Sequence, residues 1–234
     1  MTERGNRILH IIMAGILLVS MFFLAREGAV YVNSIQVAPK ETICVVIDAG
    51  HGGTDPGKVG INGSLEKDIN LEIAKCLRQF LVAEGIEVKM TREEDRGLYD
   101  ENASNKKVQD MKRRLEIIEQ SEPVLIVSIH QNSYHEEAIK GAQVFYYSTS
   151  EKSKKLAEIL QLRLKNLNPE NKRKAKGNDS YFLLKKTVKP IVIVECGFLS
   201  NKEEAEKLSS ALYQEKMAWN IYMGVMQYLN TWDK

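Results

Sequence analysis

Two histidines and a glutamate in this chain have the residue types and positions that metal-dependent hydrolysis requires. His51 closely follows the apolar run 43–48, and His130 ends the apolar run 124–130. Glu66 begins an amphipathic segment after a glycine-rich stretch, close enough in sequence for its carboxylate to fold back towards His51. An open catalytic zinc site uses three such ligands and leaves a fourth position for water. We therefore predict that these three residues bind Zn²⁺.

The alternative for each histidine is a structural side chain whose hydrogen bonds are satisfied, which is the usual case for a histidine that occurs alone. Two histidines at the ends of successive apolar runs, with a glycine-rich loop and a glutamate beside them, favour the metal site instead. His10 falls inside a long apolar run and His135 lies in a polar loop. Neither is a strong candidate ligand.

Glu195 has the position expected of a general base. It ends the apolar run 191–194, so it is partly desolvated and its pKa is raised towards the value that proton transfer needs. Beside a zinc site it can take the proton of a water that attacks a carbonyl and return it to the leaving amine. A helix-capping or salt-bridged glutamate is the alternative, and we favour the general base.

Residues 52–58 match the pattern G-x-x-x-x-G-K of a nucleotide-binding loop. However, Val59 stands where Ser or Thr must hold magnesium, and Gly60 and Gly63 interrupt the helix that should cradle phosphate. We therefore predict no nucleotide site here.

Short β-branched runs alternate with longer amphipathic segments through the rest of the chain. Strands are predicted at 43–48, 86–91, 124–130, 142–148 and 191–196, and helices at 65–85, 108–120, 151–167 and within 202–230. This pattern predicts an α/β domain with a mostly parallel, twisted sheet and helices on both faces. Active groups in such sheets gather outside the carboxyl ends of the strands, where both histidines and Glu195 fall.

Composition and charge exclude several classes of protein. The chain has 234 residues, 44% hydrophobic and 27% charged, as expected for one globular domain with an additional segment. Its net charge of +2 is far below that of a nucleic-acid-binding protein, so we expect no nucleic acid partner. Cys44, Cys76 and Cys196 lack C-x-x-C spacing, which predicts buried thiols rather than a disulfide framework or a cysteine zinc site.

Residues 8–25 contain no charged side chain and are numerous enough for a membrane-spanning helix. Arg4 and Arg7 precede them, so the positive-inside rule predicts a cytoplasmic N-terminus and an extracytoplasmic remainder. Arg26 and Glu27 give a poor cleavage context, which favours a retained signal anchor over a cleaved signal peptide. The predicted organisation is a cytoplasmic N-terminus at 1–7, a transmembrane signal anchor at 8–25, a linker at 26–42 and a catalytic domain at 43–234.

Five stretches of this sequence resemble the zinc-dependent N-acetylmuramoyl-L-alanine amidases of the amidase-3 family. They are VVIDAGHGGTDPG (45–57), LEKDINLEIA (65–74), MTREEDRG (90–97), SIHQNS (128–133) and PIVIVECGFLSN (190–201). The resemblance implies zinc ligation by His51, Glu66 and His130, with Glu195 as the catalytic carboxylate. It also implies hydrolysis of the peptidoglycan amide between the lactyl group of N-acetylmuramic acid and L-alanine.

Within the family, one catalytic domain after an N-terminal anchor, without wall-binding repeats, is most similar to the sporulation amidases. These prepare spore cortex peptidoglycan for muramic-δ-lactam formation and germination. The resemblance implies a membrane-anchored enzyme whose catalytic domain lies outside the cytoplasm, in the space around the forespore. Its expected partners are peptidoglycan, the membrane through the N-terminal helix, and the accessory activator protein that some family members need. No long inserted plug is apparent, although residues 95–110 are numerous enough to cover the site.

Two features stay open. Arg114 stands where the family has its usual arginine, but Ile118 and Glu119 replace the Ala-Asn that often follows, so Arg114 has no assigned role. The basic stretch 165–176 is interpreted as a solvated loop, with attraction to anionic wall polymers or to an accessory partner as the alternative.

Two other functions also stay open from the residues alone. The His, Glu, His ligand set suits a zinc peptidase that cuts within wall stem peptides, and only the position of the cleaved bond separates it from an amidase. A non-catalytic wall-binding regulator of the same fold predicts loss of the ligands or of Glu195, which are all present.

Overall fold

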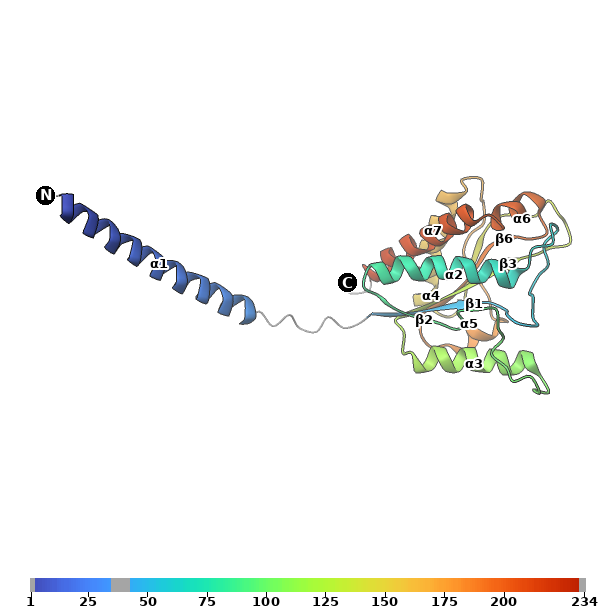
Figure 1. The fold of residues 1–234 in the computed structure, drawn as a ribbon. Helices are drawn as coiled ribbons and strands as arrows, with labels where there is room; N and C mark the ends of the chain where they lie inside the picture. The colour runs from blue at the N-terminus through green and yellow to red at the C-terminus, as the bar shows by residue number, and fades with distance from the viewer. Residues whose placement is uncertain (1–2, 35–42, 232–234) are drawn as a thin grey trace. The chain divides into compact units, whose positions relative to one another are not determined.

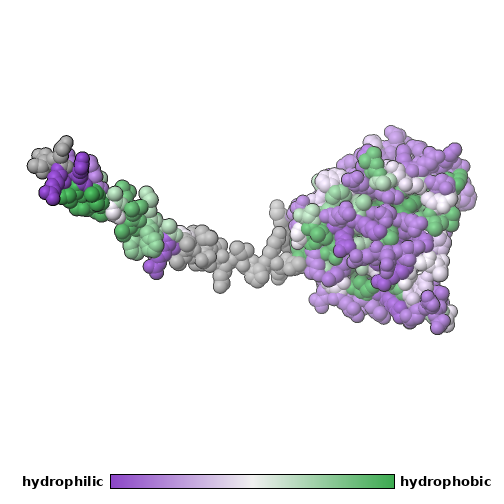
Figure 2. Space-filling view, viewed as in Figure 1, coloured by the Kyte–Doolittle hydropathy of each residue, from purple (hydrophilic) through white to green (hydrophobic). Residues whose placement is uncertain are grey.

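The computed structural model describes residues 3–34 and 43–231. The chain divides into two compact units, with the boundary between Glu41 and Thr42. The first unit contains helix α1 (Glu3–Ser34), in which apolar residues cover the middle and charged residues lie towards the ends (Figure 2). Among the described helices, α1 is long and apolar enough to cross a membrane. It extends past both ends of the run 8–25 into the predicted linker, whose later residues lie outside the described part.

The second unit is built on a six-stranded sheet in the order β2-β1-β3-β6-β4-β5 (Figure 1). The strands are β1 (Cys44–Ala49), β2 (Glu87–Met90), β3 (Leu125–Asn132), β4 (Gln143–Tyr146), β5 (Lys176–Gly177) and β6 (Ile191–Phe198). Strands β2, β1, β3 and β6 are parallel, whereas β4 pairs antiparallel with β6. The predicted α/β class is confirmed. The reversal of β4 follows from the short connection after β3, which contains no crossover helix.

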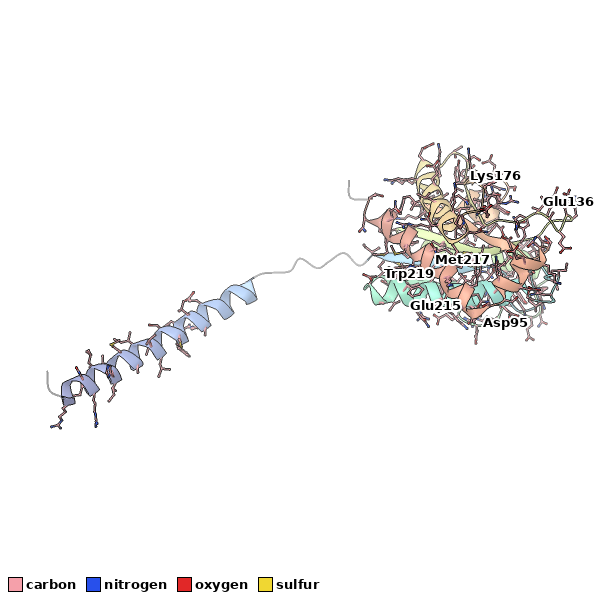
Figure 3. The ribbon with its side chains drawn as sticks, turned by 90° about the horizontal axis from the view of Figure 1, so that it is seen from above. Asp95, Glu136, Lys176, Glu215, Met217 and Trp219 are labelled. Atoms are coloured by element: carbon pink, nitrogen blue, oxygen red, sulfur yellow. The ribbon has the colours of Figure 1, made fainter. Side chains whose placement is uncertain are left out.

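Helices cover both faces of this sheet (Figure 1). They are α2 (Glu66–Ala83), α3 (Lys106–Gln120), α4 (Glu151–Leu167), α5 (Phe182–Lys186), α6 (Lys202–Leu208) and α7 (Ala211–Leu229). The larger part of the core lies between the sheet and α2, α4, α6 and α7, and a smaller part lies beneath α3 and α5. On α7, for example, Met217 is buried in the core while Trp219 remains 47% exposed (Figure 3).

Strand β1 connects the described start of this unit to the site. It begins at Cys44, one residue after the described part of the unit starts, and it lies between the edge strand β2 and β3. Its carboxyl end is followed within two residues by His51. The described start of the unit and the candidate site therefore lie at opposite ends of β1.

Candidate metal centre and active-site pocket

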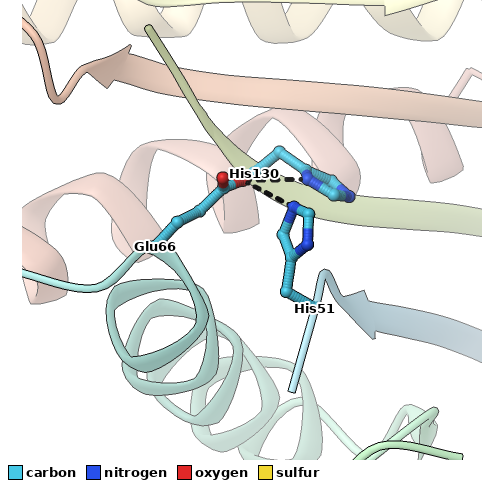
Figure 4. Close-up of side chains that lie close together, drawn as sticks. All are labelled: His51, Glu66 and His130. Carbon is cyan, nitrogen blue, oxygen red and sulfur yellow. Dashed lines mark hydrogen bonds and ion pairs between the residues drawn. The ribbon is translucent and has the colours of Figure 1, made fainter. Parts of the chain in front are cut away.

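Three side chains from separate elements meet at the carboxyl edge of the sheet (Figure 4). His51 follows β1, His130 lies in β3, and Glu66 is the first residue of α2. Oε1 of Glu66 lies 3.3 Å from Nε2 of His51 and 3.0 Å from Nδ1 of His130. Each residue offers one ligand atom, and these atoms lie within 4.8 Å of one another.

This geometry fits a small metal ion. Ligand bonds of about 2.0–2.1 Å in a tetrahedral site hold the ligand atoms roughly 3.4 Å apart, close to the 3.3 Å and 3.0 Å that separate Oε1 of Glu66 from the two imidazole nitrogens. The two imidazole rings meet edge to face with centroids 5.1 Å apart, and the Glu66 carboxylate points between them (Figure 4). Two imidazoles and one carboxylate are a donor set that zinc prefers.

The buried carboxylate of Glu66 requires a compensating positive charge. Glu66 is 2% exposed; burial acts to raise its pKa, but hydrogen bonds with His130 and His51 hold it well below its ordinary value. Burial acts to lower the pKa of His51, but Glu66 and Asp55 raise it to about 8. The buried carboxylate is therefore ionised at neutral pH, and either an imidazolium proton or a metal ion must compensate it.

The loop after β1 is shaped to bring these ligands together. His51 has a φ of 63°, a conformation that side chains rarely adopt. A Cβ atom at Gly50 would lie 2.2 Å from the imidazole of His130, so only glycine allows that ring to approach. Asp55 accepts a hydrogen bond from Nδ1 of His51 at 2.8 Å and so orients the ring with Nε2 towards Glu66.

The same loop differs from a nucleotide-binding loop. Residues 52–55 close a tight turn through hydrogen bonds between Gly52 and Asp55. Helix α2 begins only at Glu66, eight residues after Lys58, so no helix N-terminus lies where phosphate would bind.

Glu195 lies on β6 directly beside His130 of β3. It is 7% exposed, and burial raises its pKa. The hydroxyl of Tyr181 lies 3.4 Å from Oε1, whereas Oε2 is buried without a hydrogen-bond partner within the described chain. A buried polar atom of this kind usually has a water or ligand partner, so Oε2 is available to a reacting molecule.

Tyr181 is a site residue that sequence reasoning missed. It is the N-terminal cap of α5, and burial, together with the neighbouring Glu195 carboxylate, raises its pKa to about 12, so its hydroxyl remains a proton donor. Helix α5 has five residues, too few to show helical periodicity. The one local signal is Asn178, whose side chain accepts a hydrogen bond from the backbone N–H of Tyr181.

Arg114 lies behind the site in a buried network, 1% exposed. Its Nη1 donates to Oδ1 of Asp48 at 2.6 Å, and its Nη2 donates to the backbone carbonyl of His51 at 2.6 Å. Arg92, also 1% exposed, donates to the carbonyls of Ala49 and Gly50. Two buried guanidinium groups therefore hold the backbone that carries His51.

Asp48 balances this positive charge. Burial acts to raise its pKa, but the charges of Arg114 and His130 and the hydrogen bonds from Ser128 and Arg114 together outweigh burial and hold the pKa at about 2. Its second oxygen accepts a hydrogen bond from the hydroxyl of Ser128 at 2.5 Å. The carboxylate therefore links β1, β3 and α3.

A pocket of about 510 Å³ opens over the metal-ligand trio and Glu195. One wall contains Tyr99, Lys106 and Lys107, and another contains Tyr181 and Phe182. Residues 95–110 therefore flank the pocket and contribute part of its wall.

No residue of the basic stretch 165–176 lines the active-site pocket. Within that stretch Arg173 stacks 4.6 Å from the centre of the Phe198 ring, which makes at least this residue part of the packed surface.

Comparison with known proteins identifies the family. The family model Amidase_3, described as N-acetylmuramoyl-L-alanine amidase, matches residues 45–227. A germination-specific N-acetylmuramoyl-L-alanine amidase of Bacillus subtilis is 39% identical over 187 residues, which cover 79% of this chain and 78% of that protein.

Solved structures agree with this match. The CwlD amidase from Clostridioides difficile, in complex with the GerS lipoprotein, is 40% identical with a TM-score of 0.79, covering 81% of this chain and 99% of that one. The catalytic domain of the amidase CwlV from Bacillus (Paenibacillus) polymyxa is 30% identical with a TM-score of 0.72, covering 81% of this chain and 99% of that one. The chain therefore belongs to the Amidase_3 family of N-acetylmuramoyl-L-alanine amidases, as its motifs predicted, and is an enzyme of that class.

Proposed function

We propose that this enzyme uses zinc, held by His51, Glu66 and His130, to hydrolyse the amide between the lactyl group of N-acetylmuramic acid and L-alanine in peptidoglycan. The observation that carries the proposal is the convergence of three ligand atoms within 4.8 Å, beside a buried carboxylate with one unpartnered oxygen. A non-catalytic regulator would not need that second carboxylate.

Zinc, when bound, supplies Lewis-acid chemistry that polarises the scissile carbonyl and acidifies water. The protein residues keep it in place: Asp55 orients His51, and the backbone N–H of Lys58 donates to Oε2 of Glu66 at 2.8 Å. Such supporting hydrogen bonds fix the ligands in the geometry that the metal requires.

Glu195 performs the proton transfers. Its raised pKa brings its proton affinity closer to that of a base working near neutral pH. Oε2 accepts a proton from the attacking water while the water oxygen bonds to the carbonyl carbon. Glu195 then delivers this proton to the nitrogen of L-alanine as the C–N bond breaks, which yields a free carboxylate and a free amine. The Tyr181 hydroxyl, near Oε1, orients the carboxylate during both transfers.

We further propose a role in sporulation, with spore cortex peptidoglycan as the substrate and muramic-δ-lactam formation as the later outcome. The relative from Bacillus subtilis is named for germination, which supports this role. Helix α1 serves as a retained membrane anchor, and the catalytic domain acts outside the cytoplasm, around the forespore. A lipoprotein is the proposed accessory partner, since the CwlD structure contains one.

Product analysis tests this function. The full-length chain in detergent micelles, loaded with zinc, is incubated with purified peptidoglycan, and the products are analysed by mass spectrometry. Stem peptides with a free L-alanine amino terminus are expected. Cuts exclusively within the peptide would instead assign the enzyme to the zinc peptidases.

A Glu195→Gln variant provides the matched control. It keeps the size of the side chain but removes the base, so kcat should fall by a factor of about 10² to 10⁴ while zinc content stays the same. Turnover equal to that of the wild type would show that Glu195 is not the base.

A further inference from the structure

Three lysines that line the active-site pocket form no ion pair within the described part of the chain. Lys58 comes from the loop after β1, and Lys106 and Lys107 form the first turn of α3; all three line the pocket. No ion pair joins any of them to a carboxylate of the described chain, although Lys107 interacts electrostatically with Asp55. We call these three residues the lysine wall.

The carboxylates that line the same pocket already interact with residues other than these lysines. Asp55 bonds to His51, Asp110 and Asp48 bond to Arg114, Glu66 bonds to both histidines, and Glu195 lies beside Tyr181. By contrast, Lys67, which does not line the pocket, forms an ion pair with Asp95 at 2.6 Å. The lysine wall therefore carries positive charge that no ion pair among the described residues neutralises.

Helix stability does not explain the lysines on α3. The amino terminus of a helix favours acidic side chains and disfavours cations, yet the first turn of α3 contains two lysines and no acidic residue. The charges of both side chains add to the positive end of the helix dipole. Their placement opposes local stability and concentrates positive potential at the pocket.

The position of Lys106 is also defined by its neighbours. Its Nζ lies 5.3 Å from the centre of the Tyr99 ring. The Tyr99 hydroxyl in turn accepts a hydrogen bond from the backbone N–H of Thr54 at 2.8 Å. The loop that carries His51 therefore holds the aromatic ring against which Lys106 rests, which keeps this cation at a fixed distance from the metal ligands.

The two sides of the pocket therefore differ in charge. On the side of α5 its wall consists of Tyr181, Phe182 and Leu183, with no cation among the pocket residues of that segment. A molecule with one acidic end and one neutral, partly apolar end would bind in a single orientation.

We propose that the lysine wall is the specificity site for the acidic stem peptide, binding the free carboxylates that follow L-alanine. The muramyl group then occupies the side of Tyr181 and Phe182. This assignment rests on the proposed amidase function and deepens it by fixing which end of the substrate lies where. Lys106 and Lys107 act on substrate recognition rather than on bond cleavage.

A pair of synthetic substrates tests the proposal. Both are muramyl peptides of the same length, one with free carboxylates after L-alanine and one with these carboxylates amidated. The full-length zinc enzyme in detergent is expected to have a lower KM for the free acid. In Lys106→Ala and Lys107→Ala, KM for the free acid should rise about three- to tenfold, as expected for loss of one charged contact. The preference between the two substrates should shrink accordingly, and Lys106→Arg should restore it.

Lys112→Ala is the control, because Lys112 lies on the same helix, is exposed and does not line this pocket. It should leave both KM values unchanged. Equal KM values for the two substrates in the wild-type enzyme, or equal losses on both in the lysine variants, would overturn the assignment while leaving the amidase function intact. If neither substrate released a free L-alanine amine, the proposed function and this inference would fail together.

Discussion

The loop that carries His51 is strained, and two arginines stabilise it. His51 has a positive φ, which costs conformational energy unless the surroundings fix it. Arg114 and Arg92 donate hydrogen bonds to consecutive carbonyls at residues 49–51. The role of Arg114, which the sequence left open, is therefore to position the backbone of a candidate metal ligand.

Replacing Asp48 tests the charge balance of this network. Its pKa of about 2 lies below the value of about 3.9 in an unfolded chain. The ionised carboxylate thus contributes stability above pH 4, and this contribution is lost as the pH falls from about 4 to 2. The full shift corresponds to about 2 to 3 kcal/mol of the free energy of unfolding.

Urea unfolding of the wild type and of Asp48→Asn measures this effect. The difference in free energy of unfolding between the two chains should be largest near neutral pH and should shrink by about 2 kcal/mol between pH 4 and pH 2. Asp179→Asn, at an exposed position, serves as the control and should show a small, nearly constant difference. A pH-independent difference for Asp48→Asn would contradict the assigned pKa.

Metal content tests the three candidate ligands. His51→Ala and His130→Ala should each reduce bound zinc from about one ion per chain to a small fraction, because two remaining ligands bind zinc weakly. Elemental analysis after dialysis measures this, with circular dichroism to check folding. His135→Ala is the control, since its side chain is 72% exposed and lies outside the trio. Stoichiometric zinc in either ligand variant would refute that ligand.

At the scale of elements, the helices and strands that could be predicted are those with a long, regular spacing of apolar residues. The predicted helix at 151–167 agrees with α4, and the predicted strand at 191–196 falls within β6. The short elements β5 and α5 were not predicted, because two to five residues show no periodicity. The orientation of β4 was not predicted either, because it depends on the connection after β3 and not on periodicity within the strand. The candidate ligands could be chosen from residue type and strand ends, whereas Tyr181 could not, since its position depends on α5.

Helix α5 places Tyr181 beside Glu195, and this contact predicts a change in pH dependence. The hydrogen bond from Tyr181 lowers the pKa of Glu195, so Tyr181→Phe should raise it. Because the base must be ionised, activity is lost as the pH falls through this pKa. The acidic limb of the profile of kcat against pH should therefore move to higher pH in the variant.

The control for this measurement is Tyr134→Phe, since Tyr134 is 48% exposed and does not line the pocket. Its acidic limb should coincide with that of the wild type. An unshifted limb in Tyr181→Phe, with kcat lowered or not, would show that Tyr181 does not act through Glu195.

At the scale of the whole molecule, the chain combines a long apolar helix with a compact catalytic unit. If the helix is a retained anchor, the protein should sediment with membranes, and its intact mass should be that of the full 26.6 kDa chain. Deletion of residues 8–25 should move it to the soluble fraction, whereas Ser20→Ala should leave it with the membranes. A shorter native chain released into the medium would identify a cleaved signal peptide instead.

The direction of β1 has a practical consequence for work with this enzyme. The strand begins at the amino ends of the parallel strands and leads to His51 at their carboxyl ends. Over six residues this separates the two by roughly 20 Å. A purification tag, a fluorescent protein or a solid support joined ahead of residue 43 would therefore attach on the side away from the pocket. Immobilised enzyme of this kind should retain access to large, insoluble substrates.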